Sequence, residues 1–416
     1  MAKRFEIELR WIDSQAERME GLLARWAGVN TGSYNLEGLG KFAKLMREMF
    51  EELGTEMREV ATGGQRIIND AGQAELRELG RVLTGVRAGV EGAARVLLGI
   101  HYDTVYGEQE AFQNVRLEGE KMFGPGVCDA KGGLVVLFFA LMALERSSVA
   151  RGISWEVILN PDEELGSPGS AGIFEEAARR NDVGLLFEPA LPDGALVSGR
   201  KGSGNFTLVA HGRSAHAGRD PAAGRNAINA LAAGIVGLEA IGKEMAGVTV
   251  NTGFVHGGGA VNVVPDLAMC RCNVRVETVE QQRAVEARLA ELCAGIGRMD
   301  GIRCELHGGF ASPPKAMTAG MEELLRAFAE CGKEIGVPVS WRSTGGACDG
   351  NRLAAAGLVN VDSLGVRGGN IHTDQEFMMR ASLAERAKLT ALFLLRLAAG
   401  EIVLEKTVKR KDEVMR

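Results

Sequence analysis

The chain has 416 residues, of which 46% are hydrophobic and 25% are charged, and its formal net charge is -6. This composition is typical of a globular protein that folds in water, and the length predicts two domains rather than a single core. Acidic and basic residues are intermixed and form no basic stripe, which argues against a nucleic-acid partner.

Three features of the sequence predict a cytoplasmic protein that uses neither a membrane nor disulfides. The first eight residues carry charges where a signal peptide would need an apolar core. The longest apolar run, residues 134–144, is about half the length of a bilayer span and therefore predicts a buried helix. Seven cysteines without a CxxC pair are typical of a reducing compartment.

The first informative strand of the chain ends in a histidine. Helical periodicity covers residues 13–58, with Leu45 among the apolar residues of one face, and a mixed region of strands and turns follows to residue 91. An apolar run then leads into His101 and Asp103, whose spacing of two places both side chains on one face of a strand. The pair indicates either a metal-ligating imidazole oriented by a carboxylate or a hydrogen-bonded histidine at a strand end.

A glycine-rich segment, residues 124–133, follows and leads into the apolar helix. Glycines on both sides of Asp129 allow tight turns that bring its carboxylate close to another group. The segment lacks the spacing of a phosphate loop. The alternative interpretation is that Asp129 caps the helix.

Two further strands end in acidic residues. The strand predicted over residues 153–159 runs into Asp162, Glu163 and Glu164, and the strand over residues 183–187 ends at Glu188. Consecutive carboxylates repel one another unless a cation or a proton relieves the repulsion, although a solvated acidic loop is the simpler alternative. Such side chains at the ends of strands that alternate with helices are typical of the functional edge of an open α/β sheet.

From about residue 205 the pattern changes to strand-helix-strand-strand-helix-strand, which predicts a compact α+β insertion. Paired prolines at positions 313 and 314 mark its end because they cannot continue a sheet ladder. Helices and strands then alternate again. His372 lies in a glycine-rich loop before the final helix and, taken alone, is an ordinary loop histidine.

Six motifs of the chain occur in the order seen in the M20 family of dinuclear zinc hydrolases, which the chain resembles over nearly its whole length. They are His101-x-Asp103-Thr104-Val105, Gly124-x-Gly126-Val127-x-Asp129-x-Lys131-Gly132-Gly133, Asp162-Glu163-Glu164-x-Gly166-Ser167, Glu188-Pro189, Gly212-x-x-Ala215-His216-Ala217-Gly218 and Ile371-His372-Thr373.

The resemblance implies a site for two divalent metal ions. His101, Asp129 and Glu188 would hold one ion, and Glu164, His372 and the bridging Asp129 would hold the other. Zinc is favoured, while cobalt and manganese suit the same nitrogen and oxygen ligands. Glu163 would be the general base that takes a proton from the attacking water and passes it to the leaving nitrogen. Asp103 would orient His101, and the Asp129–Ala130 peptide is expected to be cis.

The resemblance also implies the architecture: an α/β catalytic domain with a mostly parallel central sheet flanked by helices, and an inserted α+β ferredoxin-like lid and dimerisation domain. We expect the catalytic domain to comprise residues 1–204 and 313–416, and the inserted domain residues 205–312. His216 would reach the partner's active site in a homodimer and stabilise the oxyanion there.

Substrate recognition is assigned to three residues. By the resemblance, Asn262 and Arg275 would grip the substrate's carboxylate, for which the planar fork of an arginine is suited. Lys201 is a further candidate because glycines flank its position after Glu188. Three nearby or later arginines are expected to be surface charges: Arg200, Arg342 and Arg352.

The predicted function is hydrolysis of the amide bond of an N-acyl amino acid or small peptide with a free carboxylate. Among enzymes, the alternative is an amino-acid deacetylase of the acetylornithine type. In another class, the alternative is a catalytically silent small-molecule binding protein on the same scaffold, but this predicts lost ligands and all five ligand positions are present. Where related glutamate carboxypeptidases carry arginine, this chain has Gly308 and Gly309, which argues against a specific glutamate preference.

Overall fold

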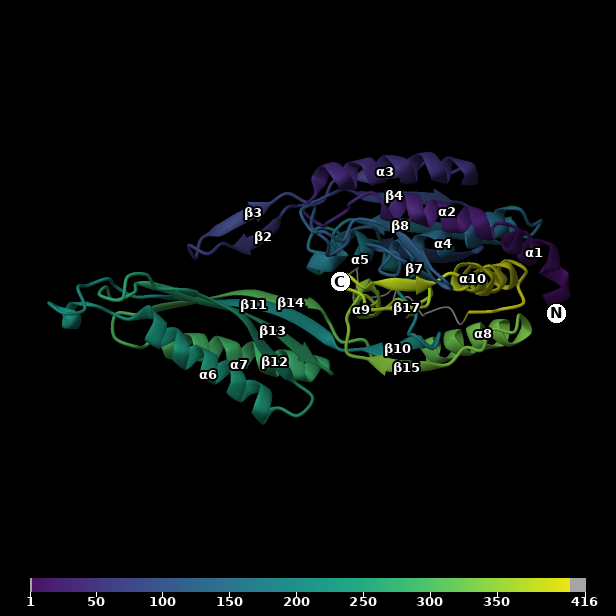
Figure 1. Cartoon of the computed structure of the whole chain (residues 1–416). Helices are drawn as coiled ribbons and strands as arrows, with labels where there is room; N and C mark the ends of the chain where they lie inside the picture. The colour runs from purple at the N-terminus through teal and green to yellow at the C-terminus, as the bar shows by residue number, and fades with distance from the viewer. Residues whose placement is uncertain (1, 405–416) are drawn as a thin grey trace.

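The computed structural model describes residues 2–404 and shows a large body with an inserted domain beside it (Figure 1). The body is built on a six-stranded sheet in the order β1-β4-β8-β5-β9-β16. Its strands are β1 (Arg58–Val60), β4 (Val82–Arg87), β8 (Ile153–Asn160), β5 (Ala94–His101), β9 (Val183–Leu186) and β16 (Asn360–Val361). The pairs from β8 to β16 are parallel and the two pairs involving β4 are antiparallel. The prediction of a mostly parallel central sheet is confirmed.

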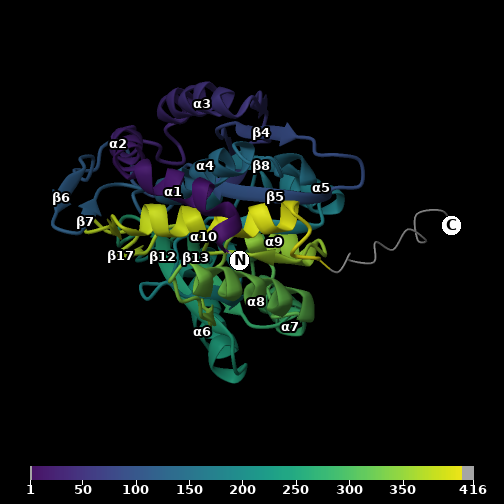
Figure 2. The ribbon, with the colours of Figure 1, turned by 90° about the vertical axis from the view of Figure 1, so that its right-hand side faces the viewer.

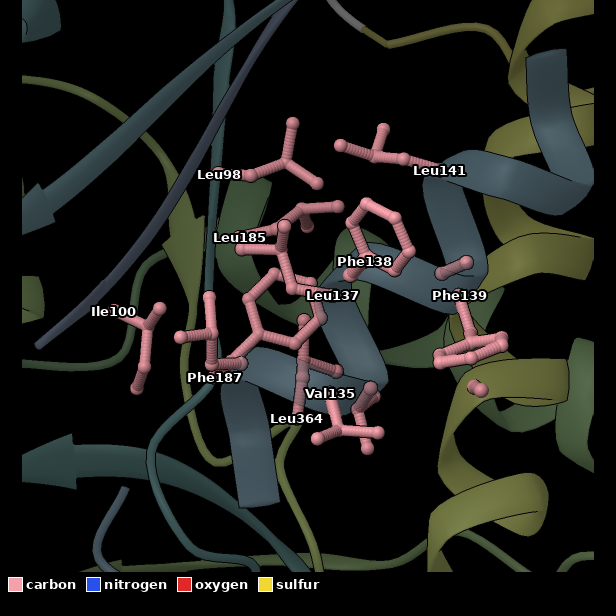
Figure 3. Close-up of a cluster of buried hydrophobic side chains, with 14 of the residues drawn as sticks. Leu98, Ile100, Val135, Leu137, Phe138, Phe139, Leu141, Leu185, Phe187 and Leu364 are labelled. Atoms are coloured by element: carbon pink, nitrogen blue, oxygen red, sulfur yellow. The ribbon is translucent and has the colours of Figure 1, made fainter. Parts of the chain in front are cut away.

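Helix α4 (Lys131–Glu145) lies at the centre of the core, and residues 134–141 of this helix are completely buried. Figure 3 shows Leu137 and Phe138 of α4 facing Leu98 of β5 and Leu185 of β9. Burial on all sides explains why this segment is apolar throughout rather than amphipathic. Within residues 2–404 no helix combines the length and the apolar character needed to cross a membrane.

The other helices of the body cover both faces of its six-stranded sheet. Helices α1 (Glu6–Ser14), α2 (Ala16–Ala27) and α10 (Ser382–Ala398) pack on α4, and Figure 2 shows α10 crossing the body next to α1. The same core includes α3 (Leu36–Phe50) and α8 (Ala319–Glu334). Helices α5 (Ala171–Arg180) and α9 (Asp349–Ala355) cover the opposite face. One expectation for α3 is wrong, because Leu45 is 39% exposed instead of buried.

The inserted domain has its own core and a sheet with one open face. Strands β11 (Gly202–His211), β12 (Thr249–Gly257), β13 (Leu267–Val276) and β14 (Arg303–Ser312) form an antiparallel sheet in the order β12-β13-β11-β14. Helices α6 (Ala227–Glu244) and α7 (Val279–Gly297) pack on one face, which confirms the ferredoxin-like prediction. A hairpin of the body projects toward the other face of this sheet (Figure 1). It consists of β2 (Gln65–Ile68) and β3 (Ala74–Arg77).

The two connections to the inserted domain are joined where they leave the body. Strand β10 (Leu196–Arg200) pairs with β15 (Trp341–Thr344) and leads into β11. The backbones of Arg200 and Lys315 exchange two hydrogen bonds of 2.9 Å. Both side chains also bind Asp362, at 2.7 Å each, and these three side chains are at most 9% exposed. The expectation that Arg200 is a surface charge is therefore wrong, because its role depends on a carboxylate 162 positions away.

A small four-stranded sheet brings two distant loops of the body together. It contains β6 (Arg116–Glu118), β7 (Lys121–Phe123), β17 (Gly368–Gly369) and β18 (Phe377–Met379) in the order β17-β18-β7-β6. The loop after β7 carries Asp129, and the loop between β17 and β18 carries His372. Pairing of β7 with β18 therefore places these two loops side by side.

Candidate metal centre and active site

Five candidate ligands meet at the carboxyl ends of the parallel strands. His101 is the last residue of β5, Glu164 lies in the 3-10 turn Glu163–Leu165 after β8, and Glu188 follows β9. Asp129 and His372 come from the two loops that the small sheet brings together. Parallel strands present their carboxyl ends at one edge of the sheet, so residues far apart in the chain converge there.

Asp129 lies between the two imidazoles. Its Oδ1 is 3.1 Å from Nε2 of His101, and its Oδ2 is 3.4 Å from Nε2 of His372. An oxygen of Glu188 is 3.8 Å from the same nitrogen of His101, and an oxygen of Glu164 is 3.2 Å from that of His372. The result is two triads, each with one imidazole and two carboxylates, that share Asp129. The peptide between Asp129 and Ala130 is cis.

Burial and mutual repulsion perturb the carboxylates of this cluster. Burial raises the pKa of Glu188 to about 8. Burial also raises the pKa of Glu163, and the charge of Glu188 raises it further. The pKa of Glu164 is raised by burial and by the charge of Asp129. Opposing the effect of burial, hydrogen bonds from His101 and His372 hold the pKa of Asp129 below its usual range. The site therefore gathers more negative charge than its imidazoles offset, as expected of a cation-binding site.

The donor atoms fit divalent metal ions. His101, Asp129 and Glu164 each offer a ligand atom within 4.8 Å of one another. Oxygen Oε1 of Glu164 is buried and has no hydrogen-bond partner among the described residues, a situation that costs free energy unless a ligand satisfies the atom. Imidazole nitrogens with carboxylate oxygens are ligands that zinc, cobalt and manganese accept.

Asp103 connects the histidine to the acidic turn. Its oxygens accept hydrogen bonds from the backbone N–H groups of Glu163 at 3.1 Å and Glu164 at 3.2 Å, and from the hydroxyl of Ser33 at 2.7 Å. Its Oδ1 also lies 3.3 Å from Nδ1 of His101. Asp103 therefore holds both the imidazole and the turn that carries the neighbouring carboxylates, as residues behind metal ligands do.

Glu376 was missed by the sequence reasoning. It is completely buried, and its carboxylate accepts hydrogen bonds from the backbone N–H groups of Cys128 at 2.8 Å, Asp129 at 2.9 Å and Gly126 at 3.2 Å. The hydroxyl of Tyr106 lies 2.7 Å from it. Glu376 thereby ties the loop of His372 to the loop of Asp129. Its only sequence signal is an acid four positions after His372 in a loop.

A cavity of about 600 Å³ opens beside the candidate ligands, with Glu163, Arg200 and Arg275 among its lining residues. Nε of Arg275 donates to Asn273 Oδ1 at 2.9 Å. Burial lowers the pKa of Arg275 while the charge of Glu163 opposes this, which places the two groups within electrostatic reach. The structure thus places Arg275 beside the candidate ligands, and its contact with the substrate's carboxylate stays a prediction.

Three predicted residues are not brought to this cavity. His216 and Asn262 lie together at an exposed tip of the inserted domain, where the carbonyl of Asn262 accepts a 2.9 Å hydrogen bond from Ala217. Lys201 faces Glu277 at 3.1 Å instead, and its neighbour Arg200 lines the cavity.

The two remaining arginines differ in exposure. Arg342 is a surface charge paired with Asp193, as expected. The same expectation is wrong for Arg352, whose side chain is only 10% exposed and binds the carbonyl of Gly166.

The fold and this cluster define a class of protein: a metallohydrolase with a mostly parallel catalytic sheet and an inserted ferredoxin-like domain. The family model described as Peptidase family M20/M25/M40 matches residues 97–396. The chain belongs to this family and is a hydrolase of peptide amide bonds.

Relatives agree with this assignment. The chain is 28% identical over 371 residues to "Carboxypeptidase G2" of Pseudomonas sp. (strain RS-16), covering 82% of this chain and 87% of the relative. A solved M20 family metallo-carboxypeptidase from Sulfolobus solfataricus has a TM-score of 0.72 at 17% identity, covering 92% of this chain and 99% of that one. The YXEP protein of Bacillus subtilis, described as a dinuclear metal-binding peptidase, has a TM-score of 0.65 at 16% identity and covers 93% and 99%. The two structural likenesses concern the fold.

Proposed function

We propose that the protein is a dinuclear, zinc-dependent hydrolase of the carboxypeptidase type, which cleaves the amide bond of an N-acyl amino acid or small peptide with a free carboxylate. The observation that supports this best is the pair of triads sharing Asp129, with Glu163 and Arg275 facing the adjoining cavity. His101 and Glu188 are assigned to one ion and Glu164 and His372 to the other.

Each residue then has a defined task. Two bound ions would supply Lewis acidity and lower the pKa of water at the site. Glu163 takes a proton from the attacking water and delivers it to the leaving nitrogen, so the amide C–N bond breaks as a C–O bond forms. Burial and the charge of Glu188 raise its pKa, which makes Glu163 a stronger proton acceptor than an exposed carboxylate. Arg275 pairs with the free carboxylate of the substrate, and Asp103 positions His101.

The exposed loop of His216 and Asn262 is proposed to complete the site of a second copy in a homodimer. Nδ1 of His216 accepts hydrogen bonds of 3.1 Å from the backbone N–H groups of Gly218 and Arg219. In a neutral ring the proton then resides on Nε2, and the exposed side chain of His216 can offer it as a donor to a developing oxyanion. The cytoplasm is the proposed compartment, and the seven cysteines are free thiols.

The test is a substrate screen on metal-reconstituted protein. N-acetyl, N-succinyl and N-benzoyl amino acids and dipeptides are assayed for release of the amino acid, with Glu163→Gln as the control. Loss of a general base lowers kcat by about 10²–10⁴-fold, so we expect that reduction with the metal content unchanged. Wild-type turnover by the metal-loaded variant would refute the role of Glu163. Absence of hydrolysis of every compound would refute the substrate class.

A further inference from the structure

A second and larger chamber adjoins the metal cavity. It measures about 1260 Å³ and lies between the β2-β3 hairpin and the open face of the inserted sheet, on the side of that sheet away from α6 and α7 (Figure 1). The chamber and the metal cavity share lining residues: Leu165, Gly166, Asn205, Asn273 and Ala311. The two spaces therefore adjoin along these residues, which places the chamber next to the candidate metal centre.

Strand β13 runs from one space to the other. Arg271, Asn273 and Arg275 alternate along it, so their side chains share the open face. Arg275 lines the metal cavity, Asn273 lines both spaces, and Arg271 lines the chamber. A strand rises about 3.3 Å per residue, so Arg271 lies about 13 Å from Arg275 along the strand. An extended chain needs about four residues to cover this distance.

Arginines outnumber carboxylates among the residues that line the chamber. Four arginines line it, and a single carboxylate, Asp70, is among its lining residues. The arginines are Arg66, Arg77, Arg271 and Arg352.

Two of these arginines are suited to bind an anion. Arg271 binds Asp70 at 2.7 Å and stacks over Phe254 at 4.3 Å, which fixes its guanidinium group. Arg66 has no carboxylate within ion-pair distance among residues 2–404. Burial lowers the pKa of the His307 imidazole, and the positive charge of nearby Arg66 lowers it further.

We infer that this chamber is a subsite for elongated substrates that carry a second carboxylate, which Arg271 binds about 13 Å from Arg275 along β13, while Arg66 of the facing hairpin adds a positive charge in the same chamber. The inference rests on the proposed function for the chemistry at the metal centre. It adds the length and the charge of the substrate. A short neutral acyl group leaves the chamber empty, whereas an acidic peptide or an acyl chain ending in a carboxylate fills it. The planar forks of the two arginines match such a carboxylate.

Calorimetric titration tests this assignment without requiring turnover. Zinc-loaded full-length protein is titrated with N-succinyl-triglycine, which has a carboxylate at both ends, and with N-butanoyl-triglycine, which lacks only the distal carboxylate. We expect the succinyl compound to bind at least tenfold more tightly. This advantage should disappear in Arg66→Gln and in Arg271→Gln. The first variant leaves the contact between Arg271 and Asp70 intact, so it also controls for damage to the hairpin.

Arg288→Gln is the matched control. Arg288 lies on α7, away from the chamber, and pairs with Glu244 at 2.7 Å with 43% exposure, compared with 2.7 Å and 39% for Arg271. This variant should keep the full advantage of the succinyl compound. Equal affinities for the two compounds in the wild type, or an advantage that survives in Arg66→Gln and Arg271→Gln, would overturn the inference. Failure of the substrate screen leaves this titration informative, so the two hypotheses fail separately.

Discussion

Asp362 is expected to be among the most costly residues to change outside the metal site. Its carboxylate is completely buried and binds two cations, Lys315 at 2.7 Å and Arg200 at 2.7 and 3.0 Å. Asp362→Asn keeps the size of the side chain and removes its charge. Two buried cations then lack their counter-ion, and breaking a buried pair in this way costs about 3–5 kcal/mol.

The loss is measured as the change in the free energy of unfolding in urea at pH 7, followed by circular dichroism. Asp193→Asn is the control, because Asp193 and Arg342 form a pair whose side chains are 55% and 52% exposed. Such a surface pair contributes about 0–1 kcal/mol. A loss for Asp362→Asn no larger than that of the control would refute the reasoning.

The same residue predicts a pH dependence. Against the effect of burial, Arg200 and Lys315 hold the pKa of Asp362 below its ordinary range. A carboxyl group whose pKa is lower in the folded state stabilises the fold above its unfolded-state pKa of about 3.9. This stabilisation is lost as the pH falls toward the folded-state value. The difference in stability between wild type and Asp362→Asn should therefore be largest near neutral pH and decrease below about pH 4.

Three further predictions follow from the site and the core. Glu376→Gln leaves one acceptor oxygen for three backbone N–H donors. Metal affinity, measured by competition with a chelator, should therefore fall about 10–100-fold. An unchanged metal affinity would contradict the positioning role of Glu376. Asp103→Asn should lower metal affinity to a similar degree. If Asp103→Asn binds metal as tightly as Ser33→Ala does, Asp103 does not position His101. Gly133→Ala in α4 would place a methyl group on the backbone oxygen of Phe187 and should prevent soluble expression. By contrast, Gly21→Ala in α2, which has open space, should raise the free energy of unfolding by about 0.5–1 kcal/mol; equal behaviour of the two variants would refute the packing argument.

Residues tied to local pattern were predictable from the sequence. The candidate ligands could be found because each follows a strand or lies in a short glycine-rich loop, and strand ends of an α/β fold meet at one edge. The alternative that Asp129 caps α4 is excluded, since the cap residue is Ala130 and no side chain caps that end.

Residues whose roles depend on distant partners were not predictable. Glu376 holds backbone groups 247 to 250 positions away, and Arg200 meets Asp362 only in the folded chain. Lys201 and Arg200 are neighbours in sequence, yet one faces Glu277 and the other the cavity. Sequence periodicity does not distinguish the two residues, because the direction of each side chain depends on the carboxylates that surround it in the fold.

The joined connections of the inserted domain determine where it leaves the body. The chain entering the domain at Arg200 and the chain leaving it at Lys315 are hydrogen-bonded to each other and anchored to one carboxylate. The inserted domain therefore leaves the body at a fixed point, beyond which its sheet begins at Gly202 and ends at Ser312. Arg200 also lines the cavity beside the candidate ligands, so the carboxylate of Asp362 fixes the base of the inserted domain at the edge of the metal cavity.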